Sequence, residues 1–413
     1  MRTLLLLIAL ALAACSSAAA STSVQFGLQD DAWLAYGEGS VQERVAALQT
    51  SGVGIVRYTV RWDQVEATRG TPDWTVPDRV LNALHDARLP ALVTLYGTPR
   101  WANGGSGANV APTSGSTFAA FARATAERYP WVRDYLIWNE PNKTQFLRPS
   151  SPTTYVRRLL NPAYATLHAA MPGAKVGGGA TGPRAGSGNG LSPIAFMRGM
   201  AAAHARLDAY AHHPYPSSRF ETPTSGGSRY CDTITMATLP RLLAEVKRDF
   251  GASKRIWLTE YGYQTYPDRT VGVSFSQQAQ YIGQAALRTF DAPRVDILIH
   301  FLYRDDIGLG GWQSGLETLT GARKPGYNAY RLPIAQRSRI GLRTVLWGQV
   351  RARSGRQPFH LQQQRSGRWY AVGGTRVTAA SGTYGVTVRA SAGARFRIWS
   401  PRDHTYSPIV TVR

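Results

Sequence analysis

Cysteine is scarce in this chain of 413 residues, which contains only Cys15 and Cys231. Cys15 directly follows Leu12-Ala13-Ala14, a join that resembles the lipobox at which bacterial lipoproteins are cleaved and lipidated. If Cys15 carries lipid, Cys231 has no partner within the chain for a disulfide. We therefore expect the fold to be held by its core.

The chain opens with one basic residue, Arg2, and the apolar run Leu4–Leu12. This pattern is typical of a secretory signal and is too short for a permanent membrane span. We expect a lipoprotein signal over residues 1–15, with cleavage near Ala18-Ala19-Ala20 as the alternative. We expect export in both cases. With lipid on Cys15, the protein would be attached only by that lipid to the outer face of the cell membrane. Without lipid, it would be secreted.

Acidic residues are also few, 25 against 47 basic ones, which gives a net charge of +22. Arginine supplies nearly all of the positive charge, because the chain has only five lysines. Such a charge could attract nucleic acid or an anionic envelope polymer. However, no cluster of five or more basic residues occurs. We interpret the charge as a dispersed basic surface, and expect no nucleic-acid partner and a monomer.

Short apolar segments alternate with helical patterns over residues 22–335. The eight strand candidates are Val24–Leu28, Ile55–Val60, Ala91–Tyr96, Tyr135–Trp138, Lys175–Gly178, Leu207–His212, Arg255–Thr259 and Asp296–Leu302. Eight such units favour a (β/α)₈ TIM barrel of the α/β class. A doubly wound sheet is the competing architecture, but no glycine-rich turn follows the first strand.

The remaining residues, 340–413, have a different pattern, with short alternating stretches separated by turns. The strand candidates there are Thr344–Val350, Arg368–Val372, Gly385–Arg389, Arg395–Trp399 and Ile409–Val412. These predict a small all-β, sandwich-like accessory domain. It could bind glycan or support the barrel. We favour support, because no row of aromatic residues is evident.

Two glutamates stand at the ends of predicted strands. Glu140 follows the fourth strand in Trp138-Asn139-Glu140-Pro141-Asn142, and Glu260 follows the seventh in Leu258-Thr259-Glu260. The carboxyl ends of barrel strands meet at one face, so both side chains should reach the same site. Two carboxyl groups placed in this way are what cleavage of a glycosidic bond with retention of configuration requires.

These residues belong to a wider pattern that resembles clan A glycoside hydrolases, especially cellulase-like family 5 and xylosidase-like family 39, over about residues 24–330. The motifs are Arg57, Arg61-Trp62-Asp63-Gln64-Val65-Glu66 with Gly70 and Asp73-Trp74, Thr98-Pro99-Arg100-Trp101, Trp138 to Asn142, His213-Pro214-Tyr215, Leu258 to Gly262, Arg304-Asp305-Asp306, Gly315-Leu316 and Lys324-Pro325. The Asn-Glu-Pro tripeptide is moderately specific, and the ordered set is strong.

The resemblance implies roles for the site residues. Glu140 would be the general acid/base and Glu260 the nucleophile, while Asn139 would bind the 2-hydroxyl of the sugar. Arg57 would sit beside the nucleophile and keep it ionised. His213 and Tyr215 follow the sixth strand, and one of them should hydrogen-bond a catalytic carboxylate.

Aromatic residues are candidate platforms for sugar rings, because the C–H face of a sugar stacks on indole. We expect Trp101 and Trp312, which lie in loops, to serve in this way. Members of the clan often carry a tryptophan at the end of the eighth strand. This chain has Phe301 and Tyr303 there, and we count Tyr303 among the expected substrate-binding residues.

No cofactor or metal is expected. Residues 177–182 formally fit a dinucleotide fingerprint, but the next helix begins only near Pro193, and we interpret the run as a flexible loop beside the cleft. His212 and His213 have no further ligand at metal-site spacing. The sequence predicts a retaining O-glycosidase acting on an extracellular or envelope polysaccharide. The alternatives are a non-catalytic glycan-binding lipoprotein and a transglycosylase with the same residues.

Overall fold

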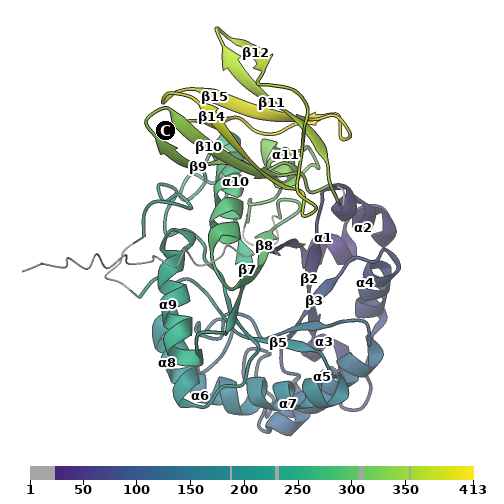
Figure 1. Cartoon of the computed structure of the whole chain (residues 1–413). Coiled ribbons are helices and arrows are strands. Elements are labelled where there is room, and N and C mark those ends of the chain that lie inside the picture. The colour runs from purple at the N-terminus through teal and green to yellow at the C-terminus, as the bar shows by residue number, and fades with distance from the viewer. Residues whose placement is uncertain (1–23, 187, 228–231, 307–310, 353–354) are drawn as a thin grey trace, which may run out of the picture.

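The computed structural model describes residues 24–186, 188–227, 232–306, 311–352 and 355–413. The predicted signal segment with Cys15 lies outside the described residues. Eight parallel strands close into a barrel in the order of the chain (Figure 1), which confirms the predicted (β/α)₈ architecture. They are β1 (Gln25–Gln29), β2 (Ile55–Arg61), β3 (Ala91–Tyr96), β4 (Asp134–Ile137), β5 (Lys175–Thr181), β6 (Ala209–His212), β7 (Arg255–Tyr261) and β8 (Val295–Phe301).

The barrel is closed by pairing of β1 with β8, in a register that places Gln25 opposite Ile297. Its strands are short, almost continuous apolar runs because both faces are buried, one in the barrel interior and one beneath the helices. The interior is filled by side chains such as Ile55, Leu136 and Trp257. All eight predicted segments therefore form strands where the sequence placed them.

One segment differs from its prediction. The glycine run that we interpreted as a flexible loop is part of β5, which continues to Thr181 and is buried from its second residue on. A β-carbon at Gly177 would lie 2.6 Å from the Trp257 ring, and Gly179 has a φ of +94°. The glycines are needed because side chains of neighbouring elements pack directly against the backbone of β5, so the run is a structural element of the barrel.

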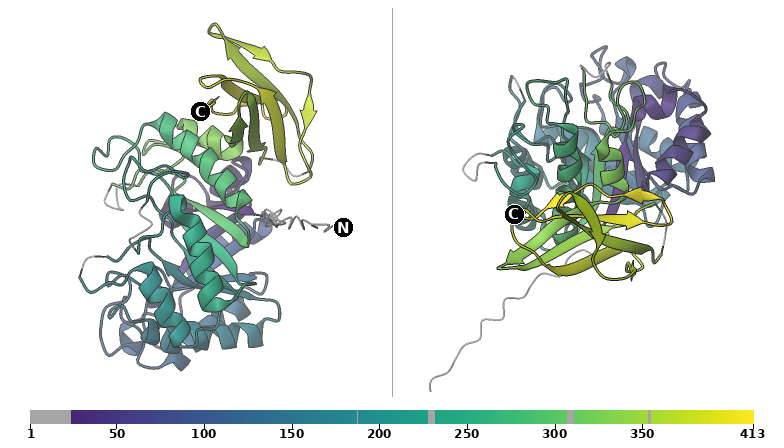
Figure 2. Two further views of the ribbon diagram at one scale, coloured as in Figure 1. Left: turned by 60° about the vertical axis from the view of Figure 1, so that its left-hand side comes forward. Right: turned by 90° about the horizontal axis from the view of Figure 1, so that it is seen from above.

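Helices cover the outside of the barrel (Figures 1 and 2). They are α1 (Asp31–Tyr36), α2 (Val41–Thr50), α3 (Trp62–Val65), α4 (Thr75–Asp86), α5 (Gly115–Arg128), α6 (Pro152–Tyr155), α7 (Asn161–Ala170), α8 (Pro193–Ala202), α9 (Leu239–Phe250), α10 (Phe275–Asp291) and α11 (Pro325–Arg331), with short turns η1 (Arg100–Ala102), η2 (Val156–Leu160) and η3 (Met236–Thr238). Among the helices that the structure describes, none is long and apolar enough to cross a membrane.

The C-terminal residues form two antiparallel sheets, as predicted. One has the order β14-β10-β9, and the other has β12-β11-β15-β16, with β13 beside β11 and β17 beside β15. Their bounds are β9 (Ile334–Ile340), β10 (Arg343–Gln349), β11 (Pro358–Arg365), β12 (Arg368–Ala371), β13 (Arg376–Val377), β14 (Thr383–Arg389), β15 (Arg395–Ser400), β16 (Thr405–Tyr406) and β17 (Val410–Thr411). The first strand begins at Ile334, earlier than the expected start at residue 340.

The β domain packs beside α10 and α11 (Figure 1), where Phe290 of α10 meets Trp347 of β10 at 5.2 Å between ring centroids. Arg351 lies over the ring of Phe26, at the start of β1. These contacts attach the domain to the amino-terminal end of β1. The residues that line the large cavity of the barrel run only from Gln29 to Trp312. The β domain therefore lies away from the described cavity walls.

Candidate active site

A cavity of about 1120 Å³ opens at the carboxyl ends of the barrel strands. Glu140 and Glu260 both line it, so the two glutamates face a common space. The cavity also continues past the pair in two directions. Asp31, Arg61 and Tyr96 line it near β1 to β3, whereas Lys143, Arg184 and Ser218 line it near β4 to β6. A chain of several sugar units would have walls on either side of the glutamates.

Glu140 is presented by an unusual backbone path after β4. Trp138 and Glu140 have positive φ values of 71° and 39°, a region that side chains other than glycine rarely adopt. The surrounding structure holds this conformation: the Trp138 indole donates to the carbonyl of Phe146 at 2.8 Å, and the Glu140 amide donates to Ala180 of β5 at 3.0 Å. Such backbone strain persists where neighbouring contacts over-determine it. It directs the Glu140 side chain into the cavity.

Glu260 lies near the end of β7, and both of its carboxylate oxygens are hydrogen-bonded. Arg57 Nη1 donates to Oε1 at 2.6 Å, and the Tyr215 hydroxyl donates to Oε2 at 3.0 Å. Burial and the nearby Glu260 charge raise the pKa of Tyr215 well above its ordinary value. Tyr215 therefore keeps its proton and remains a donor to Glu260.

Arg57 is fixed in one position by the barrel interior. It is only 1% exposed, and its Nε donates to Thr94 Oγ1 at 2.9 Å while Nη1 also donates to the Thr259 carbonyl at 3.0 Å. Nη2 donates to Asn139 Oδ1 at 2.8 Å. Since its oxygen is engaged by Arg57, Asn139 presents its amide N–H groups to other partners. This arrangement places Arg57 beside Glu260 and leaves Asn139 able to donate to a sugar hydroxyl, as the resemblance implies.

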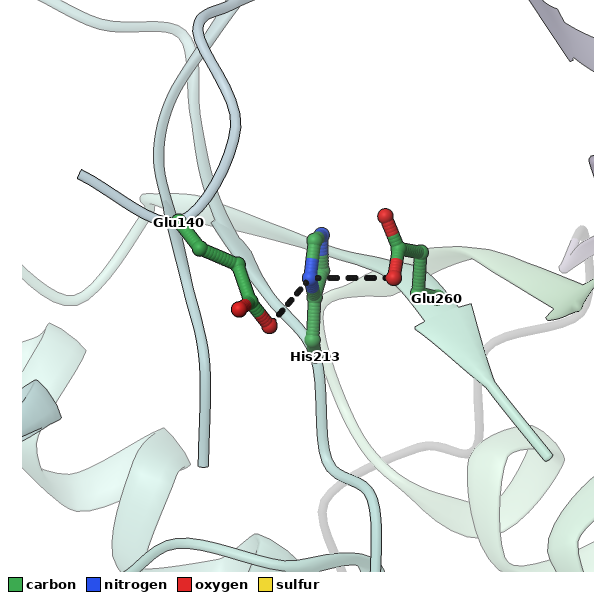
Figure 3. Close-up of side chains that lie close together, drawn as sticks. All are labelled: Glu140, His213 and Glu260. Atoms are coloured by element: carbon green, nitrogen blue, oxygen red, sulfur yellow. Dashed lines mark hydrogen bonds and ion pairs between the residues drawn. The ribbon is translucent and has the colours of Figure 1, made fainter. Parts of the chain in front are cut away.

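His213 lies between the two glutamates (Figure 3). Its Nδ1 is 3.1 Å from Glu140 Oε1 and 3.5 Å from Glu260 Oε2. The neighbouring His212 is not part of this set, because its ring contacts Thr181 Oγ1 at 2.9 Å and the Ile234 carbonyl at 3.1 Å. Burial lowers the pKa of His212 to about 3, so it is a neutral packing residue.

Glu140, His213 and Glu260 offer ligand atoms that all lie within 4.8 Å of one another, close enough for a metal ion. Yet each carboxylate already has a cationic partner. Arg57 Nη1 is 2.6 Å from Glu260, and Lys143 Nζ is 2.6 Å from Glu140. A divalent cation would meet both positive charges at short range, which opposes binding. The donor set therefore fits proton and sugar chemistry better than metal binding.

Lys143 is the site residue that the sequence did not suggest. It stands three residues after Glu140 in the turn that follows Asn-Glu-Pro, and a cation at this spacing was the available signal. Burial raises the pKa of the Glu140 carboxyl, but the His213 hydrogen bond and the Lys143 charge together outweigh burial and lower it from 4.5 to about 2. Without a ligand, Glu140 is therefore a carboxylate.

The aromatic residues that the sequence analysis named near the site separate into two pairs. Trp312 and Phe301 line the cavity, and their ring centroids are 5.8 Å apart. Trp101 is not among the lining residues, because its indole donates to the Glu66 carbonyl at 2.7 Å. Tyr303 is buried and stacks on Trp33 at 4.1 Å. Of the residues expected to contact a sugar, Trp312 lines the cavity, whereas Trp101 and Tyr303 pack against other parts of the protein.

Comparison with solved structures matches most of the chain. A family 39 glycoside hydrolase from the gut symbiont Bacteroides cellulosilyticus WH2 is 15% identical, with a TM-score of 0.60 and coverage of 88% of this chain and 81% of the other. A family 39 β-xylosidase from Caulobacter crescentus is 16% identical, with a TM-score of 0.57 and coverage of 84% of this chain and 84% of the other. A glucosidase from Croceicoccus marinus is 12% identical, with a TM-score of 0.61 and coverage of 91% of this chain and 95% of the other.

At such low identity these likenesses show the fold. The resemblance to clan A glycoside hydrolases that the motifs indicated thus extends to the barrel architecture and to most of the chain. No protein-family model matches the sequence, and no curated protein does. The chemistry must therefore be argued from the side chains.

Proposed function

We propose that this protein is a retaining O-glycoside hydrolase, with Glu260 as nucleophile and Glu140 as general acid/base. The main support is that Glu140 and Glu260 share one cavity, with carboxylate oxygens within 4.8 Å of each other. In retaining enzymes the two carboxyl groups are about 5–5.5 Å apart, whereas inverting enzymes keep them about 6.5–9.5 Å apart to admit a water. The short separation supports retention.

The reaction would proceed in two displacements. In the first, a Glu260 oxygen attacks the anomeric carbon, the bond from that carbon to the leaving oxygen breaks, and Glu140 gives its proton to that oxygen. In the second, Glu140 takes a proton from water, the water oxygen attacks the anomeric carbon, and Glu260 leaves as a carboxylate. Arg57 balances the charge of Glu260 at the start and end of this cycle, and Tyr215 orients its second oxygen.

The substrate class is inferred from similar solved structures and from the N-terminal sequence. Solved structures of similar fold are named as a β-xylosidase and a glucosidase, which favours a sugar polymer or oligomer as substrate. The apolar N-terminal run and the join at Cys15 favour export and lipid attachment. We therefore infer action on an extracellular or cell-envelope polysaccharide. Lipid attachment is tested by incorporation of labelled fatty acid, which should be lost in Cys15→Ala.

The activity is tested by sugar release from a panel of β-glucans, xylan, mannan and envelope polysaccharides, with Glu260→Gln as the inactive control. NMR of the earliest product from a cleaved substrate should show the anomeric configuration of the starting bond. An inverted first product, or full activity of Glu260→Gln, would contradict the proposal. Transfer of sugar to added glycan acceptors in place of water would identify a transglycosylase. Glycan binding without turnover would identify a binding protein.

A further inference from the structure

We propose that the leaving-group side of the cavity binds an oxyanion on the substrate through Lys143 and Arg184, and that this anion draws Lys143 away from Glu140. The anion would be a carboxylate, sulfate or phosphate on the sugar that departs. The inference rests on the proposed function, because it assigns Glu140 the role of acid. It names the substrate class as an acidic glycan and gives Lys143 a positioning role.

The first support is where Lys143 touches Glu140. His213 contacts Oε1 of Glu140 and lies between it and Glu260, whereas Lys143 Nζ pairs with Oε2 at 2.6 Å. Lys143 therefore contacts the carboxylate oxygen of Glu140 that His213 does not contact. The leaving group of a retaining glycosidase departs on the side of its general acid. A charged group on the departing sugar would thus come close to Lys143.

The second support is that the chain makes room for Lys143. A β-carbon at Gly182 would lie 2.5 Å from Lys143 Cε, 2.7 Å from its Nζ and 2.8 Å from Glu140 Oε1. One at Gly186 would lie 3.3 Å from Lys143 Cβ. Side chains at these two positions would crowd the lysine. The loop after β5 therefore forms a seat for Lys143 beside Glu140.

Asn142, the residue before Lys143, holds that loop in place. Its Oδ1 accepts from the Gly182 amide at 2.8 Å, and its Nδ2 donates to the carbonyls of Arg184 at 3.2 Å and Leu191 at 3.1 Å. Asn142 is completely buried. One buried side chain thus ties together the turn that carries Lys143 and the loop that carries Arg184, and both residues line the cavity.

Arg184 supplies the second positive charge. It lines the cavity, and its Nη2 donates to the Pro216 carbonyl at 2.8 Å. Within the described part of the chain, no carboxylate forms an ion pair with it. A guanidinium carries five N–H donors in a planar fork that suits carboxylate, sulfate and phosphate oxygens. Arg184 therefore has donors available for an anion in the cavity.

The groups around Glu140 determine its protonation once Lys143 turns to the anion. Glu140 then keeps the contact with His213, while Arg57 and Tyr215 remain engaged with Glu260. Burial and the negative charge of Glu260 both disfavour a second carboxylate nearby. The pKa of Glu140, which burial raises and the contacts with His213 and Lys143 lower, would rise as the Lys143 contribution is lost. Binding of an acidic leaving group would thereby favour the protonated form of Glu140, which donates the proton that this leaving group takes up.

The test compares matched substrates. A uronate-containing polysaccharide that the protein cleaves is compared with its carboxyl-reduced, neutral form, and sulfated or phosphorylated glycans with their desulfated or dephosphorylated forms. The pH dependence of kcat/KM is measured for the wild type. We expect an at least tenfold preference for one anionic form over its neutral counterpart, and activity that persists to higher pH by one unit or more. The pair that shows this preference identifies the anion.

Variants assign the effect to Lys143. Lys143→Met should abolish most of the preference and extend activity on the neutral substrate to higher pH, whereas Lys143→Arg should retain part of the preference. Lys175→Met, at the exposed start of β5, is the control for loss of a lysine charge and should behave as wild type. The wild-type comparison alone needs no variant, so it remains decisive if Lys143→Met does not fold.

Two results would overturn the inference. One is equal kcat/KM and equal pH limits for charged and neutral substrates in the wild type. The other is a preference for the anionic form that Lys143→Met leaves unchanged. Failure of the proposed function looks different, because the wild type would then cleave none of the substrates, including an activated nitrophenyl glycoside that needs little acid assistance.

Discussion

Each of the two glutamates has a cationic partner at the same distance, but the two cations differ in burial and in their other contacts. Arg57 is 2.6 Å from Glu260 and 1% exposed, whereas Lys143 is 2.6 Å from Glu140 and 21% exposed. Arg57 also donates to Thr94, Asn139 and the Thr259 carbonyl. No second carboxylate pairs with Lys143 among the described residues. One cation is locked in the barrel interior, and the other lies at the cavity wall.

This difference matches the two roles in the proposed mechanism. A nucleophile must be ionised whenever a substrate arrives, so a permanently fixed arginine suits it. A general acid/base must gain and lose a proton in each cycle, so its cationic partner must be able to leave. Lysine is a single charge on a flexible stem, whereas arginine is a planar fork that holds several acceptors. The two cations therefore suit two different protonation requirements.

Removing the nucleophile should have the largest effect. Glu260→Gln keeps the shape of the side chain and can still contact Arg57, but it cannot form the glycosyl intermediate. We expect kcat to fall by about 10⁴-fold or more. Glu127→Gln, on the exposed face of α5, is the matched control and should retain wild-type activity. Substantial turnover by Glu260→Gln would remove the distinction between the two carboxylates.

Removing the acid/base should depend on the leaving group. Glu140→Gln should lower kcat/KM by about 10²–10⁴-fold for a substrate whose leaving group is a sugar, since that oxygen needs a proton. For a nitrophenyl glycoside, whose leaving group is stable as an anion, the fall in the first displacement should be much smaller. Pre-steady-state release of nitrophenol measures that displacement directly. An equal loss on both substrates would argue that Glu140 positions the sugar and does not transfer a proton.

The barrel could be predicted from sequence because each strand is a short buried apolar run flanked by helical patterns, a local signal. The strands of the β domain that the sequence analysis did not predict, such as β9 and β11, lack this local signal. In β11, only Leu361 separates His360 from Gln362-Gln363-Gln364, so polar residues hide the alternation, and the strand forms because it pairs with β15. In β9 only the first residues are buried. β9 forms by pairing in a hairpin with β10, the next strand, and β11 by pairing with the more distant β15.

The site shows the same limit. Glu140 and Glu260 could be predicted because strand ends converge in a barrel. The sequence predicts both Trp101 and Trp312 in loops, and only the folded chain shows that Trp101 lies in η1 and donates to Glu66 while Trp312 meets Tyr215. Contacts between segments distant in sequence decide which aromatic residue reaches the cavity.

The difference between the two cations should also appear in stability. Arg57→Met leaves Glu260 without its cationic partner and the Asn139 oxygen without its donor, and breaking a buried ion pair costs about 3–5 kcal/mol. Lys143→Met should cost only about 1 kcal/mol, because Lys143 is partly exposed and Glu140 can take up a proton instead. Urea unfolding at pH 6 measures both free energies of unfolding. Similar losses in the two variants would show that Lys143 is as firmly built in as Arg57.

The smallest effect concerns acid stability. The pKa of Glu140 in the folded protein is about 2, below the ordinary value of 4.5. A carboxyl group with a lowered pKa adds stability that is fully present above about pH 4.5 and is lost as the pH falls toward 2. Without Lys143 the pKa of Glu140 is lowered less, so Lys143→Met should lose less stability than the wild type between pH 4.5 and pH 2. Urea midpoints measured across this range, with Lys175→Met as control, test the difference. Parallel curves for wild type and Lys143→Met would mean that Lys143 contributes nothing to the ionisation of Glu140, and the contrast with Arg57 would then rest on geometry alone.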